Sequence, residues 1–197
     1  MGKKIIIAIT GASGSVYARR LLNKLQVNRN QIEALDVVFS TTAREIWKYE
    51  LGTSVADLSG DFTVYGKSDF YAPFASGSAG YDTMIIIPCS MGTLGRIASG
   101  VSDDLITRAA DVMLKERKRL ILVIRENPYN LIHLKNMTLL TEAGAVIAPA
   151  TPSFYSLPLT VEDVVDTVVD RVLDLAGLEN HGFRCQDRGE KAGQKEA

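Results

Sequence analysis

The chain has 197 residues and a mass of 21.5 kDa, a length that predicts one folded domain. Its 22 Lys and Arg nearly balance 23 Asp and Glu, which speaks against a general nucleic-acid binder because such proteins carry a basic excess. No apolar run approaches the roughly 20 residues of a membrane-spanning helix, and the amino-terminal run is too short for a signal peptide. Two distant cysteines favour neither a disulfide framework nor a zinc site. We therefore expect a cytoplasmic protein that binds neither nucleic acid nor membrane.

Five short apolar runs, each followed by small or polar residues, predict strands that are covered on both faces. They lie at residues 5–9, 37–39, 84–87, 120–124 and 145–148. Segments with the helical spacing of apolar residues lie at 13–25, 104–119 and 160–176. Strands that alternate with helices predict an α/β fold, a single-domain, Rossmann-like, doubly wound parallel sheet with helices on both faces.

The segments at the ends and in the middle of this pattern differ in how clearly they can be assigned. Thr160 with Asp163 three residues later forms a capping-box signature, and Gly177 would end that helix. Residues 52–80 have weak periodicity, and a segment of that length is either functional or contains a short helix that the pattern does not locate. We expect the folded domain to cover residues 1–178 and a polar, poorly ordered tail to cover 179–197.

Ligands of an open parallel sheet bind beyond the carboxyl ends of its strands, so the residues after each apolar run are the first candidates. After the first run comes TGASGS at residues 10–15, whose small side chains would let N–H groups at a helix start contact an anion. The spacing matches neither GxGxxG nor GxxxxGK[ST], and the second run ends in Ser40 rather than in the acidic residue that a dinucleotide ribose requires. This favours binding of a mononucleotide phosphate over binding of NAD. Alternatively, the segment is an ordinary tight turn.

Further candidate ligand-binding groups follow the third and fourth apolar runs. PCSMGTLG at residues 88–95 is a second loop of small and hydroxyl side chains, and Arg125 and Glu126 follow the fourth run. Arg125 could bind carboxylate or phosphate through both edges of its guanidinium, or it could pair with Glu126 or another neighbour. We interpret Cys89 as a small buried residue rather than as a nucleophile.

Two more segments have patterns that ordinary structural roles can explain. Arg108, Asp111 and Lys115 share one helix face by their spacing, a pattern typical of solvated ion pairs. Three prolines within residues 149–158 predict a stiff, extended arm that packs on its own domain or on a partner subunit.

The sequence offers few groups for acid–base or metal chemistry. It has two histidines, His133 and His181, and neither follows a strand end. No cluster has metal-ligand spacing, and no GxSxG elbow is present. We therefore expect a bound cofactor to carry the chemistry and no metal to take part.

In combination, these motifs resemble the UbiX family of flavin prenyltransferases, formerly described as aromatic-acid decarboxylase subunits. The resemblance covers residues 4–178 and rests on GASGS at 11–15, PCSMGT at 88–93, TRAADVMLKERKRLILVIRE at 107–126, IHLKNM at 132–137 and PATPSFYSLP at 149–158. The five motifs in this order are specific, whereas any one of them alone would be weak.

The resemblance implies non-covalent binding of FMN, with dimethylallyl monophosphate stacked over it. The residues it assigns to FMN are Gly11, Ala12, Ser13, Ser40, Ser90, Met91, Gly92, Thr93 and Arg125. Those it assigns to the allylic phosphate are Arg108, Lys115, Tyr155 and Arg171, the last two reaching in from a neighbouring subunit. Those it places at the reaction centre are Ser15, Glu50 and Glu126.

The implied reaction joins the allylic C1 to N5 of reduced FMN as phosphate leaves, and then C6 to C3. Clustered cations and a tyrosine hydroxyl would stabilise the charge on the departing phosphate. We hypothesise that Glu126, Ser15 and this phosphate manage the proton lost from C6. The resemblance also implies a homododecamer with sites at subunit interfaces and a UbiD-type decarboxylase that receives the prenylated FMN.

The sequence departs from the family pattern at two places and leaves two alternative functions open. Many relatives carry Lys where this chain has Gly92, and an Arg-Trp-Gln element where residues 183–186 read FRCQ. A flavin-dependent cysteine decarboxylase would use a histidine base and a PASANT-type motif, but no histidine precedes His133 and the motif is absent. A non-catalytic FMN-binding subunit would have no use for Arg108 or Glu126.

Overall fold

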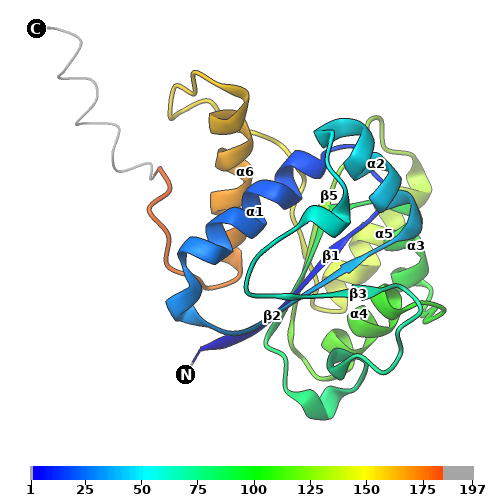
Figure 1. Cartoon of the computed structure of the whole chain (residues 1–197). Helices are drawn as coiled ribbons and strands as arrows, with labels where there is room; N and C mark the ends of the chain where they lie inside the picture. Colours follow the sequence, from blue (N-terminus) through cyan, green and yellow to red (C-terminus); the bar gives the residue numbers. More distant parts are fainter. Residues whose placement is uncertain (1, 184–197) are drawn as a thin grey trace, which may run out of the picture.

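Residues 2–183 are described by a computed structural model, in which six parallel strands form one sheet (Figure 1). The strand order is β3-β2-β1-β4-β5-β6, so the direction of winding reverses between β1 and β4. The strands are β1 (Lys3–Ile9), β2 (Ile32–Phe39), β3 (Thr63–Gly66), β4 (Thr83–Cys89), β5 (Arg119–Ile124) and β6 (Val146–Ile147). All neighbouring pairs are parallel, which confirms the predicted doubly wound α/β fold.

Helices cover both faces of this sheet. The helices are α1 (Ser15–Val27), α2 (Thr41–Leu51), α3 (Met91–Ala98), α4 (Leu105–Lys115), α5 (Leu131–Glu142) and α6 (Val161–Leu175). Residues of α1, α2 and α6 join one apolar core, and residues of α3, α4 and α5 join the other. Figure 1 shows α1 beside α6 on one side of the strands and α3, α4 and α5 on the other. Along β1, Ile5 and Ile7 face the first core and Ile6 faces the second.

Both ends of α6 agree with the sequence prediction, whereas the carboxyl end of α4 does not. At α6, the Thr160 side chain accepts from the Asp163 N–H, the Asp163 side chain accepts from the Thr160 N–H, and Gly177 follows with φ 68°, as predicted. The helix predicted over residues 104–119 was too long, because Arg117 takes a left-handed conformation with φ 55° and Arg119 already pairs with β4. The basic residues after Lys115 therefore form a turn and a strand start.

Residues 52–80 contain the edge strand β3 and three short 3₁₀ turns, η2 (Val55–Asp57), η3 (Pro73–Ala75) and η4 (Gly77–Ala79). The periodicity missed β3 because it has four residues and is largely exposed. Other predicted bounds were close but not correct. The first predicted helix begins at residue 15 rather than 13, the run at 37–39 is the end of a longer β2, and β6 is shorter than the run at 145–148.

Residues 179–183 form neither helix nor strand, and the rest of the predicted tail, with Cys185, lies outside the described residues. Between residues 2 and 183, none of the helices combines the length and the apolar character that crossing a membrane requires.

Candidate functional site

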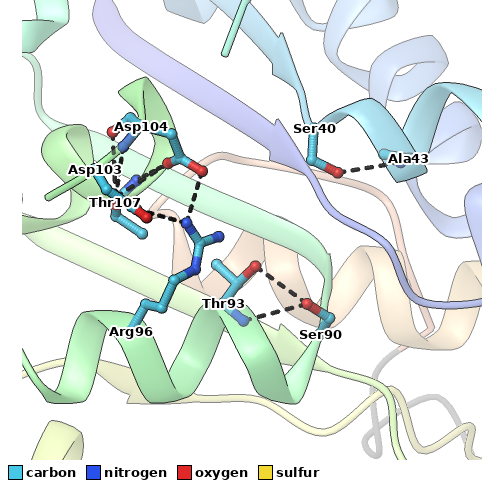
Figure 2. Close-up of polar contacts among 8 residues, drawn as sticks. All are labelled: Ser40, Ala43, Ser90, Thr93, Arg96, Asp103, Asp104 and Thr107. Atoms are coloured by element: carbon cyan, nitrogen blue, oxygen red, sulfur yellow. Dashed lines mark hydrogen bonds and ion pairs between the residues drawn. The ribbon is translucent and has the colours of Figure 1, made fainter. Parts of the chain in front are cut away.

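Two serines at strand ends cap the helices that follow them. Ser40 Oγ accepts a hydrogen bond from Ala43 N at 3.1 Å, and Ser90 Oγ accepts from Thr93 N at 3.3 Å (Figure 2). The Ser90 hydroxyl also donates to Thr93 Oγ1 at 3.1 Å. β2 and β4 flank β1, and both caps follow carboxyl ends of their strands, so these hydroxyls border the point where the strand order reverses.

Thr10 joins the two loops at this point. Its side chain is 1% exposed, and its Oγ1 donates to Pro88 O at 2.7 Å while it accepts from Ser90 N at 2.8 Å. The Thr10 hydroxyl therefore fixes the end of β1 against the end of β4, together with the bond from Thr10 N to Pro88 O at 3.3 Å. The sequence placed Thr10 in the candidate loop TGASGS but did not predict this bridging role, because a threonine after an apolar run looks like an ordinary strand end.

Glu50 holds the start of α1. Its carboxylate accepts from Gly14 N at 3.0 Å and from Ser15 N at 2.7 Å. Burial would raise the pKa of Glu50, but hydrogen bonds from the Ser13 hydroxyl and from the N–H groups of Ser15 and Gly14 outweigh it and lower the pKa below its ordinary value. The prediction that the N–H groups at this helix start are free for an anion was therefore wrong for two of them, because a charged carboxylate already satisfies them.

Arg125 and Glu126 continue the same edge after β5. Arg125 N donates to Cys89 O at 3.3 Å, which ties the end of β5 to that of β4. Burial raises the pKa of Tyr17 and the positive charge of Arg125 opposes that rise, which places the guanidinium near this α1 residue. Within residues 2–183 Arg125 makes no salt bridge, so the predicted alternative of a pair with Glu126 is not formed. Glu126 accepts from Asn127 N at 3.0 Å.

Two of the three predicted reaction-centre residues, Ser15 and Glu50, are in contact. Ser15 is buried and bonded to Glu50, whereas Glu126 is bonded to its own neighbour along the chain.

In the first loop, a Cβ added at Gly11 would lie 2.9 Å from Thr42 Cβ, so glycine allows this loop to approach α2 closely. A Cβ at Gly92 would meet nothing within 4 Å, so that position has room for a side chain.

Cys89 is fully buried, and burial raises the pKa of its thiol to about 12. The burial confirms the predicted small buried residue, and a raised thiol pKa disfavours the reactive thiolate. Across residues 2–183, the structure contains no group of three His, Cys, Asp or Glu side chains that could hold a metal ion.

The four residues assigned to the allylic phosphate fall into two pairs on opposite layers. Tyr155 and Arg171 line a cavity of about 650 Å³ between residues 148–159 and α6. Arg108 and Lys115 lie on α4, whose apolar side packs against the other face of the sheet. One chain therefore does not bring all four side chains around one phosphate.

Each α4 cation has an acidic neighbour. Arg108 Nη1 lies 3.5 Å from Asp111 Oδ2, which confirms one ion pair of the predicted helix face. Lys115 Nζ instead lies 3.7 Å from Glu116 Oε1. Both pairs are partly exposed, so they add little to stability and can yield to a bound anion.

A cluster of ion pairs that the sequence did not predict fixes the start of α4 against α3. Arg96 Nη1 lies 2.7 Å from Asp103 Oδ1 and 2.8 Å from Asp104 Oδ2 (Figure 2). Asp104 also caps α4, since its Oδ1 accepts from Thr107 N at 2.9 Å. Burial would raise the pKa of Asp104, but the Thr107 N–H and the Arg96 guanidinium lower it below its ordinary value.

Comparison with known proteins gives consistent matches over most of the chain. The model of the family described as Flavoprotein matches residues 1–173. Flavin prenyltransferase UbiX of Methanocaldococcus jannaschii is 44% identical over 184 residues, which cover 92% of this chain and 97% of that protein. The chain belongs to the UbiX family of flavin prenyltransferases.

Two solved structures agree with this membership of the UbiX family. The crystal structure of AnUbiX (PadA1) in complex with FMN and dimethylallyl pyrophosphate has a TM-score of 0.84 and 42% identity, covering 93% of this chain and 100% of that one. A dodecameric FMN-dependent UbiX-like decarboxylase from Escherichia coli O157:H7 has a TM-score of 0.85 and 42% identity, covering 92% and 97%. The resemblance inferred from the five sequence motifs is confirmed.

Replacing Thr10 tests the bridge between the β1 and β4 loops. Thr10→Val keeps the side-chain shape but removes the hydroxyl, so Ser90 N loses this acceptor and Pro88 O keeps only the longer bond from Thr10 N at 3.3 Å, which should cost about 1–3 kcal/mol of unfolding free energy. Urea denaturation measures this loss. Thr10→Ser keeps the hydroxyl and should lose less than about 1 kcal/mol. Equal stability of the Val variant and the original protein would show that the bridge does not hold the loops.

Asp104→Asn tests the charge at the start of α4 and predicts a pH dependence. Asn keeps the capping oxygen but loses the ionic contact with Arg96, at a cost of about 1–2 kcal/mol at pH 7. The folded-state pKa of Asp104 is lowered, so the ionised carboxylate stabilises fully above its ordinary pKa of about 4, and this contribution is lost as the pH falls through the lower folded value.

The stability difference between Asp104→Asn and the original protein should therefore shrink as the pH falls below about 4. Thermal unfolding followed from pH 7 downward measures it. Asp103→Asn removes a more exposed carboxylate from the same arginine and should change stability by less than about 0.5 kcal/mol. A difference for Asp104→Asn that stays constant across this pH range would contradict the assignment.

Proposed function

We propose that this protein is a flavin prenyltransferase that joins the dimethylallyl group of dimethylallyl monophosphate to N5 and C6 of reduced FMN. The observation that carries the proposal is the meeting of three loops, those after β1, β4 and β5, at the point of strand-order reversal. They meet in a chain 42% identical to AnUbiX, a protein solved with FMN and dimethylallyl pyrophosphate. A UbiD-type decarboxylase would receive the prenylated product.

The groups at the carboxyl edge fit FMN. The hydroxyls of Ser40, Ser90 and Thr93 and the guanidinium of Arg125 are donors of the kind that a phosphate monoester and a polar ring edge need. FMN, when bound and reduced, would supply the nucleophilic atoms that accept the allyl group. Glu50 would keep its charge near neutral pH and hold Ser15 in place through the start of α1.

The phosphate site would be shared between copies of the chain. Arg108 and Lys115 of one copy and Tyr155 and Arg171 of another would surround the departing phosphate and stabilise its growing charge. Exposed apolar side chains support such contacts, since Phe154 is 67% and Leu159 93% exposed on the arm beside the cavity. The relative from Escherichia coli is dodecameric, and we propose the same assembly here.

The proposal is tested by incubating the protein with reduced FMN and dimethylallyl monophosphate. We expect a flavin product heavier by one C5 unit and release of one phosphate, measured by mass spectrometry and a phosphate assay. A parallel incubation with the pyrophosphate establishes which leaving group is preferred. Release of carbon dioxide from a cysteinyl substrate would favour the decarboxylase alternative, and flavin binding without either reaction would favour a binding subunit.

Glu126→Gln tests the proton-transfer role of that carboxylate. FMN affinity and phosphate release should persist, while the yield of ring-closed product should fall about 100-fold or more because the amide cannot accept the proton. Glu142→Gln, an exposed glutamate at the end of α5, is the matched control and should leave the yield unchanged. Normal product formation by Glu126→Gln would refute this role.

Shared sites predict complementation between two inactive variants. Arg108→Ala and Arg171→Ala should each lose most activity, but their co-expressed mixture should regain roughly a quarter of it, the share of sites that draw both intact arginines from different copies. Isotope-labelled copies show by native mass spectrometry that the mixed assembly has formed. No recovery in a mixed assembly would show that one copy supplies both arginines.

A further inference from the structure

A segment at residues 67–79, which we call the strap, contacts α4 near its start, in its middle and at its end. Lys67 O accepts from Leu105 N at 2.7 Å, and Ala75 O accepts from Arg108 Nε at 3.1 Å. A Cβ added at Gly77 would lie 2.3 Å from Glu116 Oε1, so the strap backbone also touches the acidic partner of Lys115. The strap therefore contacts Arg108 directly and Lys115 through Glu116.

Phe74 anchors the strap in the core. Its side chain is 1% exposed and makes edge-to-face contacts with Tyr65 at 5.1 Å and with Tyr81 at 5.7 Å between ring centroids. The Tyr81 hydroxyl donates to the buried carboxylate of Asp36, which fixes the second ring. Because Ala75 directly follows Phe74, the position of its carbonyl is set by this aromatic packing.

The Ala75 carbonyl restricts the guanidinium of Arg108. Its bond uses Nε, and the weaker pair with Asp111 uses Nη1, so the Nη2 edge lies outside both contacts and the bond to Ala75 O is the one that a bound anion does not displace. An arginine held in one orientation loses less conformational freedom when it binds an anion than a mobile one does. A held guanidinium also keeps its donors aligned with charge that develops during the reaction.

We infer that the strap is a positioning element that orients Arg108 toward the allylic phosphate, with Phe74 as its anchor. The inference rests on the proposed function, because it takes Arg108 to bind that phosphate. It gives a role to part of the segment 52–80, which the sequence predicted to be either functional or to contain a short helix that could not be located. Phe74 acts through Ala75 and Arg108 and is itself not a catalytic residue.

Phe74→Leu tests the inference. We expect kcat/KM for dimethylallyl monophosphate to fall about 10- to 100-fold, since the guanidinium is no longer held in place, while the FMN dissociation constant changes less than about twofold. Phe74→Met keeps more of the side-chain volume, should fold if the Leu variant does not, and should show a smaller loss in the same direction. Tyr71→Leu is the matched control, because this aromatic residue of the strap is 100% exposed and should have no effect.

A double-mutant cycle with Arg108→Ala separates positioning from general loosening of the core. Arg108→Ala alone should lower kcat/KM strongly, and adding Phe74→Leu or Phe74→Met should then change it less than about twofold. An equal loss from the Phe74 variant with and without Arg108 would overturn the inference and leave the proposed function standing. Normal kcat/KM of Arg108→Ala would instead overturn the phosphate role of Arg108, and the inference with it.

Discussion

The reversal of strand order between β1 and β4 is the constraint on which the rest of the molecule depends. Chain leaving β1 crosses towards β2 over one face of the sheet, and chain leaving β4 crosses towards β5 over the other. The two loops diverge, and such a point at the carboxyl edge of an open parallel sheet is where ligands bind. The Thr10 hydroxyl and the Thr10 N–H join the two loops there. These few bonds suffice because their partners are backbone groups whose positions the sheet already sets.

The same geometry explains what the sequence could and could not predict. Strands covered on both faces are continuous apolar runs, so β1, β4 and β5 were recognisable, and loops at their ends were natural site candidates. The edge strand β3 lacks that cover, and α5 exposes Leu131 and Ile132, so neither shows the pattern of a core element. The contact of Glu50 with the start of α1 joins residues 35 positions apart, and no local pattern reports such a pairing.

Glu50 also changes which groups at this carboxyl edge are available to an anion. A helix start attracts phosphate through free N–H groups and the positive end of its dipole. Here a carboxylate takes two of these groups at α1, and hydrogen bonds from Ser13 and the backbone keep it ionised. A second negative charge at the same place would be repelled. This favours the serine-capped starts of α2 and α3 and Arg125 for the phosphate binding proposed above.

The cations of α4, which we propose to bind a phosphate, each lie beside an acidic side chain in this chain. Several unpaired cations converging on one point within a single chain would repel one another. In this chain Arg108 and Lys115 lie on the layer opposite Arg171, and each has an acidic neighbour at 3.5 or 3.7 Å. Contacts of that length in partly exposed positions are weak enough for a phosphate to displace. In the proposed function, the orientation of Arg108 would then come from a contact that the phosphate does not compete for, and the Ala75 carbonyl beside Phe74 is such a contact.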